Sequence, residues 1–354
     1  MKIKAKIVGA GGYGGVGLME ILSRHPEVEI GCLVAKDDVN KPVTDVYPHL
    51  HGFIDMPILP ADAPEAQEDF DVVFFSTPDK VGMQLAAAER AKGAKVIDFS
   101  GDFRFRDLPE YEEYARRISL DPTHAAPELL PESVYGLPEL GLDKVQGANI
   151  VGNPGCFAVS VLLGFAPALQ AGLVDPLHLI ADCKTGVSGA GKKPNPLFHF
   201  PARHDHMNAY RLTGHQHVCE VEQNLGKLGG KPAMLTFTAQ VVPTTRGILS
   251  TLYGRLEEGV DMDRVLKVYR DFYADSVFVK VFDRSAATGL GTAHVRGSNQ
   301  SFLIVDADER TGTLRVVSHI DNLMKGQAGS AVQNMNLMFG FQENLGLDQP
   351  GAYP

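Results

Sequence analysis

Short apolar runs alternate with helix-like segments over the N-terminal part of the chain. The apolar runs end at Val8, Val34, Phe75 and Ser100, and apolar residues with helical spacing follow the first and third of them. The later runs are apolar on both faces, which is typical of strands covered from both sides. The pattern therefore predicts an α/β domain with a parallel sheet, built from repeated strand–helix units.

A different pattern follows in the second half of the chain. Strand-like runs lie at 177–183, 233–239, 248–253, 302–305 and 313–317, separated by long helical or loop stretches. Such spacing favours an α+β domain with a mixed or antiparallel sheet. The apolar positions 331, 332, 335, 338 and 339 predict a last helix over 328–345 that returns to the first domain. We place the first domain at 1–153, completed by 326–354, and the second at 154–325.

Composition narrows the classes of protein. Of 354 residues, 44% are hydrophobic and 21% are charged, and no apolar run approaches the length of a membrane span. The net charge of −10 argues against binding to nucleic acid. The four cysteines show no close pairing, and the charged N-terminus does not look like a signal peptide. We therefore expect a cytoplasmic protein with reduced thiols that acts on neither nucleic acid nor membranes.

A glycine-rich segment at 9–15 lies between the first strand and the first helix. Glycines in such a segment let the backbone turn sharply and approach a pyrophosphate at a helix N-terminus. A simple strand-to-helix turn is the alternative, but the position favours a dinucleotide site in a Rossmann-type domain. The residues expected to contact the cofactor here are Gly9, Gly12, Tyr13, Gly14 and Gly15.

The end of the second strand bears on which dinucleotide binds. A site for NAD places an acidic residue there, to hold the 2′-hydroxyl of the ribose. In this chain the first polar residue is Lys36, a cation suited to a 2′-phosphate, with Asp37 and Asp38 after it. The segment favours NADP over NAD, and the two neighbouring aspartates leave NAD open.

Cys156 is the candidate nucleophile, because it precedes an apolar run that reads as a helix. The free N–H groups and the positive dipole end of a helix N-terminus favour the thiolate form of a cysteine. A buried structural thiol is the alternative interpretation of Cys156 alone. The other motifs of the chain decide between a nucleophile and a structural thiol.

Two further segments complete a candidate site. A loop at 184–193 follows a strand, contains glycines and hydroxyl groups and ends in two lysines, so it predicts either an anion-binding nest or a solvated turn. A helix is expected to begin close to His217, which places His215 and His217 at its N-terminus, where the dipole favours a neutral imidazole. Glu220, one turn further, would orient the ring of His217. No third ligand accompanies the two histidines at the spacing of a zinc site, so we expect no metal.

Eight segments of this chain, in the same order, are similar to those of N-acetyl-γ-glutamyl-phosphate reductases, and the resemblance spans essentially the whole sequence. They are 9–15, 47–50, 98–104, 135–139, 153–156, 186–191, 215–223 and 333–336. The resemblance implies that the Cys156 thiolate attacks an acyl phosphate, that phosphate leaves, and that the thioester accepts a hydride from NADPH to give an aldehyde. His217 is the expected acid and base, with His215 in reserve.

The resemblance also implies further site residues and an assembly. Ser76, Ser188, Gly189 and Asn336 would contact the cofactor, and the small-molecule acyl phosphate would contact Asn153, Arg104, Ser188, Lys192 and Arg246. A surface ion pair is the alternative for each cation. A homo-oligomer, either a dimer or a tetramer, is expected because large sheets in such second domains often form subunit interfaces.

The chain departs from the family at a few positions. Serine is common where Gly11 stands, serine and arginine where Ala35 and Lys36 stand, and arginine between the histidines where this chain has Gln216. These departures affect the contacts to cofactor and substrate. Three alternatives stay open: an aspartate-semialdehyde dehydrogenase, a reductase of carrier-linked glutamyl or aminoadipyl phosphate, and a non-catalytic NADP-binding regulator, which would need neither Cys156 nor His217.

Overall fold

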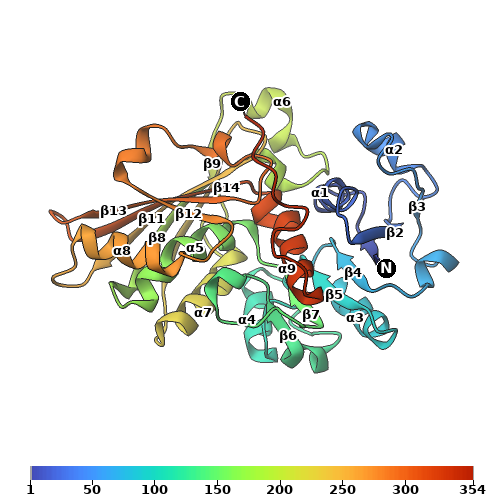
Figure 1. Ribbon diagram of the computed structural model, residues 1–354, viewed down its shortest axis with the longest axis horizontal. Coiled ribbons are helices and arrows are strands. Elements are labelled where there is room, and N and C mark those ends of the chain that lie inside the picture. The colour runs from blue at the N-terminus through green and yellow to red at the C-terminus, as the bar shows by residue number, and fades with distance from the viewer. Residues whose placement is uncertain (1, 354) are drawn as a thin grey trace.

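The first sheet is parallel throughout and has the strand order β3-β2-β1-β4-β5-β7-β6. The structure is a computed structural model that describes residues 2–353 (Figure 1). The strands of this sheet are β1 (Ile3–Val8), β2 (Val28–Val34), β3 (Ile58–Leu59), β4 (Val72–Phe75), β5 (Lys95–Asp98), β6 (Ser133–Tyr135) and β7 (Ile150–Gly152). The predicted α/β sheet is confirmed. Its three short strands β3, β6 and β7 lie outside the predicted runs.

Helices pack against this sheet and one of them comes from the far end of the chain. They are α1 (Tyr13–Leu22), α2 (Val43–Val46), α3 (Gly82–Ala91), α4 (Leu108–Arg117) and α9 (Gly329–Phe339). Figure 1 shows α9 beside α1, between the two sheets. A Cβ atom at Gly17 of α1 would come within 3.0 Å of the Ala328 side chain, so glycine allows this close approach.

The last helix is shorter than the pattern predicts. The expected range 328–345 is wrong at its C-terminal end, because Gly340 adopts a left-handed conformation with φ 74° and ends α9. A π-helical turn, Met324–Ala328, precedes α9. Such turns are rare and frequently occur at functional sites.

The second sheet is mixed and has the strand order β12-β13-β14-β11-β8-β10-β9. Its strands are β8 (Val174–Thr185), β9 (Asn208–Tyr210), β10 (Leu235–Val241), β11 (Ile248–Leu256), β12 (Val279–Asp283), β13 (Ser301–Asp308) and β14 (Thr313–Ile320). The pairs β8–β10 and β12–β13 are parallel and the others antiparallel. The mixed sheet was predicted, whereas its strands β9 and β12 lie outside the predicted runs.

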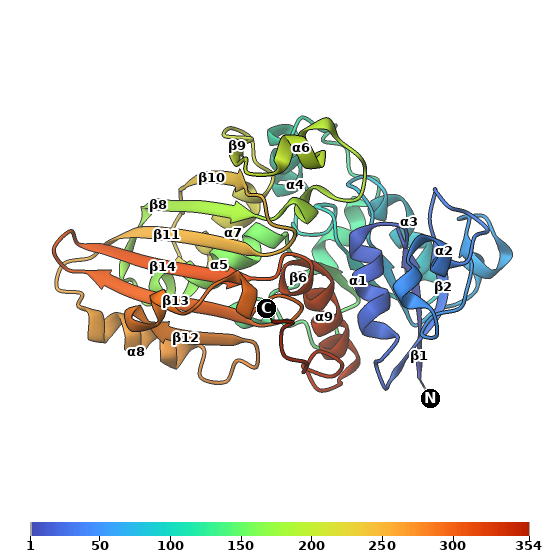
Figure 2. The ribbon, with the colours of Figure 1, turned by 90° about the horizontal axis from the view of Figure 1, so that it is seen from above.

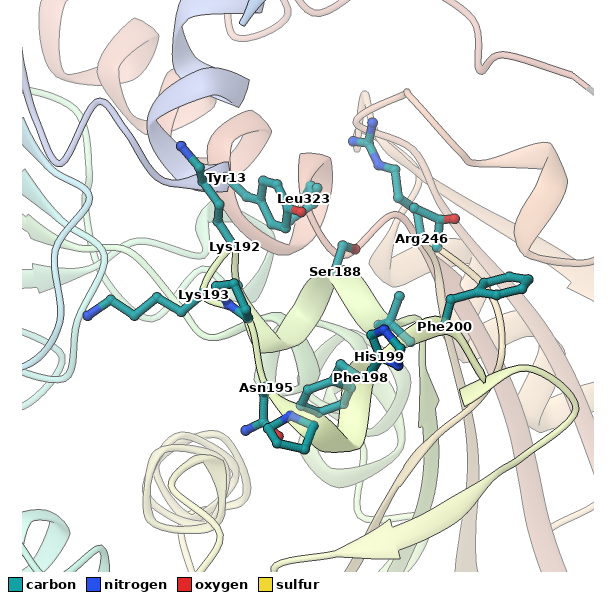
Figure 3. A pocket seen from close by; sticks show the side chains of 15 residues that line it. Tyr13, Ser188, Lys192, Lys193, Asn195, Phe198, His199, Phe200, Arg246 and Leu323 are labelled. Carbon is teal, nitrogen blue, oxygen red and sulfur yellow. The ribbon is translucent and has the colours of Figure 1, made fainter. Parts of the chain in front are cut away.

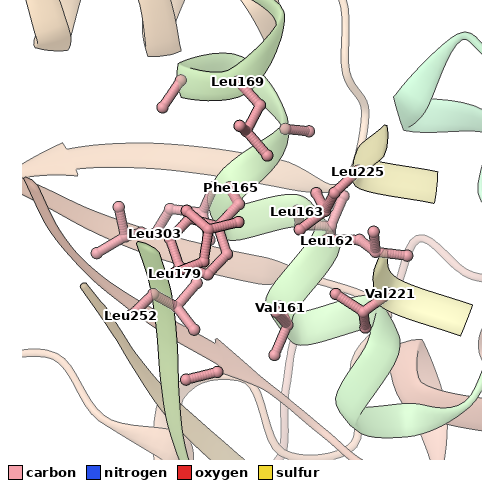
Figure 4. Packing of buried hydrophobic residues seen from close by; sticks show 14 of the residues in the cluster. Val161, Leu162, Leu163, Phe165, Leu169, Leu179, Val221, Leu225, Leu252 and Leu303 are labelled. Atoms are coloured by element: carbon pink, nitrogen blue, oxygen red, sulfur yellow. The ribbon is translucent and has the colours of Figure 1, made fainter. Parts of the chain in front are cut away.

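Helices cover one face of the second sheet (Figures 1 and 2). They are α5 (Cys156–Gln170), α7 (His217–Gly229) and α8 (Met262–Phe272), and the short α6 (Phe200–Arg203) lies near β9. Helix α5 is buried on nearly all sides. Figure 4 shows Leu163 and Phe165 of α5 among side chains of the sheet and of α7. This packing fixes the direction in which the N-terminus of α5, and therefore Cys156, points.

Candidate active site

A cavity of about 770 Å³ lies where the two sheets meet. The residues that line it come from the glycine loop, from the turn before α5, from the loop after β8, from the start of α7 and from the π-helical turn. A second cavity of about 850 Å³ adjoins it and shares Tyr13, Ser188 and Lys192 with it. Figure 3 shows Ser188, from the loop after β8, facing Tyr13 of α1 across this second cavity. The structure thus brings together the separate motifs of the sequence.

The glycine loop is tightly packed at the positions where the sequence has glycine. Gly9 has a φ of +94°, and a Cβ there would come within 2.1 Å of the Ser76 carbonyl oxygen. A Cβ at Gly14 would lie 2.4 Å from the Ser76 Oγ, and one at Gly15 would lie 2.5 Å from the Gly9 carbonyl oxygen. The first turn of α1 carries no acidic side chain and no side-chain cap. Its N–H groups are therefore suited to an anion such as a pyrophosphate.

The cleft beside this loop fits a dinucleotide. Gln327, on the π-helical turn, lies close to Gly14, and its Oε1 is buried without a hydrogen-bond partner among the described residues. A buried acceptor without a donor is costly unless a ligand supplies one. Lys36 is exposed directly after β2, next to Ala35, whose Cβ lies 3.8 Å from a Cβ built at Gly11. Ser76 and Gly12 also line the cleft.

Asn336 does not lie in the cleft, and its expected contact with the cofactor is wrong. It is fully buried in α9, where its Oδ1 lies 3.0 Å from the His25 Nε2. Its Nδ2 donates to the carbonyl oxygens of Glu343 and Leu345. The amide therefore holds the chain after α9 in place, and the residues that line the cleft lie before α9, Gln327 and Leu323 among them.

Cys156 opens α5, as predicted, and lies against Gly326. A Cβ at Gly326 of the π-helical turn would come within 2.8 Å of the Cys156 Cβ. Burial raises the pKa of Cys156 to about 11, although the N–H of Phe157 and the charge of Arg104 both lower it. For this thiol, the loss of hydration therefore outweighs the effect of the helix N-terminus that the sequence indicates. The thiol needs a base.

His217 provides a neutral imidazole next to Gly155, the residue before Cys156. Its Nε2 lies 2.1 Å from the position of a Cβ built at Gly155, and its Nδ1 has no hydrogen-bond partner among the described residues. Burial lowers the pKa of His217 well below its usual value, and the nearby charges of His215, Arg104 and Arg211 lower it further. From the sequence, we expected the helix dipole to keep the His217 imidazole neutral. In the structure, burial is the main cause of the lowered pKa.

His215 stands behind His217 in an aromatic environment. Its ring packs on Phe237 and Phe157, with ring centroids 4.7 and 5.7 Å apart, and its Nδ1 accepts from the N–H of His217 at 3.2 Å. Burial lowers the pKa of His215 to about 4, with Arg211 adding to the shift. His215 therefore holds the start of α7 in place as a neutral group.

Glu220 does not orient the ring of His217, so that expectation is wrong. Its Oε2 pairs with the Arg104 Nη1 at 3.1 Å, and its Oε1 accepts from the Tyr135 hydroxyl at 2.7 Å and from the N–H of Gly155 at 2.9 Å. Glu220 and Arg104 are almost fully buried. The Glu220 carboxylate pairs with Arg104 because a buried guanidinium needs a counter-charge.

Arg104 and Asn153 line the cavity but are held by protein partners. Arg104 also donates to the carbonyl oxygens of Asn153 at 2.8 Å and Phe99 at 2.6 Å. The Asn153 Nδ2 donates to the carbonyl oxygen of Gln327, and its Oδ1 accepts from Asn334. Both residues support the turn that carries Cys156, and their contact with the substrate stays a prediction.

The loop after β8 is not a nest of free N–H groups, which was one of the two alternatives that the sequence left open. The N–H groups of Val187, Ser188, Gly189 and Gly191 donate to carbonyl oxygens within the protein. The loop is held against residues 244–245, and the Ser188 Oγ accepts from the Asn322 Nδ2 at 2.9 Å. Its anion-binding capacity therefore rests on side chains.

The two cations expected near this loop are both present at the cavities. The Lys192 Nζ lies 3.8 Å from the Asp38 Oδ2 and 5.0 Å from the centre of the Tyr47 ring, so it reaches across the cleft to the first sheet. The Arg246 Nε pairs with Asp321 at 3.1 Å. Figure 3 shows Lys192 and Arg246 at the second cavity. Gly189 lines the first cavity, as expected.

Several lining residues were missed by the sequence motifs. They are Tyr210, Arg203, Arg211, Asn322, Leu323, Gly326 and Gln327. The glutamine and glycine between the last strand and the last helix could have been noticed as polar breaks before an apolar helix. Nothing in the local sequence identifies the residues around β9. Among residues 2–353, no group of three or more His, Cys, Asp and Glu side chains is placed to hold a metal ion.

Comparisons with known proteins agree with this arrangement. The family model described as the NAD binding domain of semialdehyde dehydrogenase matches residues 4–148, and the one described as the semialdehyde dehydrogenase dimerisation domain matches residues 156–322. The structure of aspartate semialdehyde dehydrogenase II from Vibrio cholerae is similar in fold, with a TM-score of 0.70 over 96% of this chain and 99% of that chain, at 16% identity. Fold and site thus define a protein of the semialdehyde dehydrogenase class.

Curated relatives narrow the class to one family. N-acetyl-gamma-glutamyl-phosphate reductase of Symbiobacterium thermophilum is 43% identical, with 100% of both chains covered. The protein of the same name from Desulforudis audaxviator is 41% identical over 99% of this chain and 100% of the relative. The chain belongs to the N-acetyl-γ-glutamyl-phosphate reductase family. No helix in the described part of the chain is both long and apolar enough to cross a membrane.

Proposed function

We propose that this protein reduces N-acetyl-γ-glutamyl phosphate to N-acetylglutamate 5-semialdehyde and phosphate, with NADPH as reductant, in arginine biosynthesis. The observation that carries the proposal is the position of Cys156. It opens a helix directly after Gly155, against which the neutral imidazole of His217 lies, in the same cavity as the tightly packed glycine loop. Nucleophile, base and dinucleotide cradle are the parts that such a reduction needs.

Cys156 and His217 carry the acyl transfer. The His217 imidazole takes the proton of the Cys156 thiol, and the thiolate sulfur forms a bond with the acyl carbon. The bond between that carbon and the phosphate oxygen breaks, so phosphate leaves and a thioester remains. The raised pKa of the thiol and the lowered pKa of the imidazole keep both groups neutral until substrate arrives. The N-terminus of α5 then stabilises the negative charge that develops.

The residues of the glycine loop would hold the nicotinamide cofactor. Gly9, Gly12, Gly14 and Gly15 give the pyrophosphate access to the N-terminus of α1, with Tyr13, Ser76 and Gly189 around the cleft. When bound, the cofactor supplies the hydride that reduces the thioester. His217 then returns its proton to the oxygen of the thiohemiacetal, and the same proton is withdrawn as the aldehyde is released and the Cys156 sulfur departs.

NADP is proposed over NAD because of Lys36. Its side chain is exposed at the end of β2, where a 2′-phosphate would lie. Replacing Lys36 with Glu is expected to lower the ratio of kcat/KM for NADPH to that for NADH by about tenfold or more. The exposed Lys231, replaced by Glu as a control, should leave the ratio unchanged.

Ser188, Lys192 and Arg246 are proposed to bind the phosphate of the substrate. They lie at the second cavity, which is continuous with the one that contains Cys156 through shared lining residues. The ion pair of Lys192 with Asp38 is long, at 3.8 Å, and its side chain is 41% exposed, so the ammonium group is available to an anion.

The proposal includes the assembly and location of the protein. We divide the chain into a cofactor-binding domain, 1–153 completed by 326–354, and a catalytic domain, 154–325. Leu177 and Ile180 of β8 are exposed, and the match to a dimerisation domain supports a homo-oligomer through this region, as a dimer or a tetramer. All four cysteines are free thiols, which supports a cytoplasmic location.

The test is the reverse reaction with several aldehydes. Phosphate-dependent reduction of NADP would be measured with N-acetylglutamate semialdehyde, aspartate semialdehyde and a carrier-linked glutamyl or aminoadipyl semialdehyde. The proposal predicts turnover of the first in clear preference to the others. Preference for another aldehyde would assign the protein to that substrate, and no turnover of any would support a regulator without catalysis.

A further inference from the structure

Two arginines outside the proposed mechanism line the cavity that contains Cys156. Arg203 is the last residue of α6 and is only 6% exposed, whereas Arg211 directly follows β9 and is exposed. Within residues 2–353, their hydrogen bonds go to neutral acceptors and neither forms an ion pair with a carboxylate. Two cations without a counter-charge at one cavity favour an anionic ligand there.

The guanidinium of Arg203 is buried among neutral hydrogen-bond acceptors. The Nη atoms donate to four neutral oxygens, the Asn208 Oδ1 at 2.9 Å and the carbonyl oxygens of Leu197, His206 and Val241. Its Nε is buried without a hydrogen-bond partner among the described residues. Burial of an unpaired charge is costly, so a bound anion is the counter-charge that this arrangement lacks.

Arg211 connects the cavity to the proposed base. Its Nη1 donates to the Gln216 Oε1 at 2.8 Å, and the Gln216 Nε2 lies 3.5 Å from the His217 Nε2. Arg211 has a φ of 45°, a left-handed conformation that is unfavourable for a residue other than glycine and that persists where the surroundings require it. The series Arg211, Gln216 and His217 therefore leads from an exposed guanidinium to the ring beside Gly155 and Cys156.

We propose that Arg211 binds a carboxylate of the acyl substrate, with the buried charge of Arg203 supporting it. The inference rests on the proposed function, in which the acyl chain carries an α-carboxylate beyond the reacting carbonyl. The planar guanidinium matches a carboxylate in two parallel hydrogen bonds. Arg246 lines only the second cavity and Lys192 lines both, whereas Arg203 and Arg211 line only the first, so the two anionic ends of the substrate have different partners. Gln216 orients Arg211 and links it to His217.

The test compares two aldehydes in the reverse reaction of the full chain. One is N-acetylglutamate semialdehyde and the other is 4-acetamidobutanal, which lacks the carboxylate. Arg211→Gln removes the charge of an exposed side chain and leaves the fold intact, and Arg211→Lys restores a charge. Arg310→Gln is the matched control, because Arg310 is exposed on the turn between β13 and β14.

The expected result is a selective loss. Arg211→Gln raises the KM for N-acetylglutamate semialdehyde about tenfold or more and lowers the kcat/KM for 4-acetamidobutanal far less. The KM for phosphate stays the same, Arg211→Lys recovers part of the loss, and Arg310→Gln behaves as the parent protein. An increased KM for phosphate instead would assign the arginine to that anion. An equal loss with both aldehydes, or no loss with either, would equally overturn the proposal.

A second readout does not depend on the identity of the substrate. Alkylation of Cys156 by iodoacetate and by neutral iodoacetamide is followed by peptide mass, and the ratio of the two rates is compared between variants. Arg211→Gln should lower this ratio several-fold, about as expected for loss of one nearby charge, while Arg310→Gln should not. If the parent protein oxidised no aldehyde, the proposed function would fail, and an unchanged ratio would separately overturn the carboxylate site.

Discussion

The imidazole of His217 occupies the space that a side chain at Gly155 would need. A Cβ at Gly155 would come within 2.1 Å of the His217 Nε2, and the other contacts to that Cβ are also atoms of this ring. Two helices thus meet through their first turns, α5 with Cys156 and α7 with His217. The absence of a side chain at one position is what allows base and nucleophile to be neighbours.

Replacement of Gly155 by Ala tests this relationship. The added methyl group must displace the ring, so we expect kcat to fall about a hundredfold or more, as for loss of a general base, while the KM for the cofactor changes little. Gly291→Ala is the control, because a Cβ there meets nothing within 4 Å and the backbone is extended. A Gly155→Ala protein with the kcat of the control would show that the ring is not needed where it lies.

Glu220→Gln is expected to destabilise the fold as well as the site. The substitution leaves the buried Arg104 without its counter-charge, which costs about 3–5 kcal/mol when a buried pair loses one partner. Tyr135→Phe removes only one hydrogen bond to the same carboxylate and should cost about 1 kcal/mol. Urea unfolding of both variants measures the difference. Equal free energies of unfolding would mean that the ion pair contributes nothing beyond one hydrogen bond.

The first glycine of the cofactor loop is predicted to tolerate no side chain. At Gly9, alanine meets both a φ of +94° and the Ser76 carbonyl oxygen at 2.1 Å, so we expect the KM for NADPH to rise about tenfold or more. At Gly11, in the same loop, a Cβ meets only the Ala35 side chain at 3.8 Å. Gly11→Ala should therefore keep the KM within about twofold. Similar KM values for the two variants would contradict the proposed cradle.

The buried histidines predict a loss of stability in acid. The pKa of His215 is about 4 in the folded protein and about 6.5 when unfolded, so the unfolded state binds more protons between these values. The free energy of unfolding should fall by about 3 kcal/mol from this residue as the pH falls from about 7 to about 4. Urea unfolding across this range should show a shallower loss in His215→Gln. The exposed His51→Gln is the control, and a slope unchanged by His215→Gln would refute the assignment.

Much of the fold could be predicted because its signals are local. The runs ending at Val34 and Phe75 give their strands directly, and the glycines at 9–15 mark the turn into α1. The strands β6 and β9 have three residues each, too few for any period to show. The end of α9 was missed because Gly340 interrupts a pattern that continues past it.

Only part of the candidate site could be predicted from local sequence. Cys156 and His217 could be proposed because each begins a helix, which is visible in the sequence. The ion pair of Glu220 could not be predicted, because Arg104 lies 116 residues away and only the fold brings it near. The raised pKa of Cys156 could not be predicted either, because burial in the folded protein outweighs the helix N-terminus that the sequence reveals.

The most direct test of the account is whether Cys156 carries the acyl group. N-acetylglutamate semialdehyde and NADP would be mixed with the protein in the absence of phosphate, and NADPH absorbance and the mass of the Cys156 peptide would be followed. The account predicts a burst of about one NADPH per active site and an N-acetylglutamyl group on Cys156, both absent in Cys156→Ser. A burst without the adduct, or full turnover by Cys156→Ser, would contradict it.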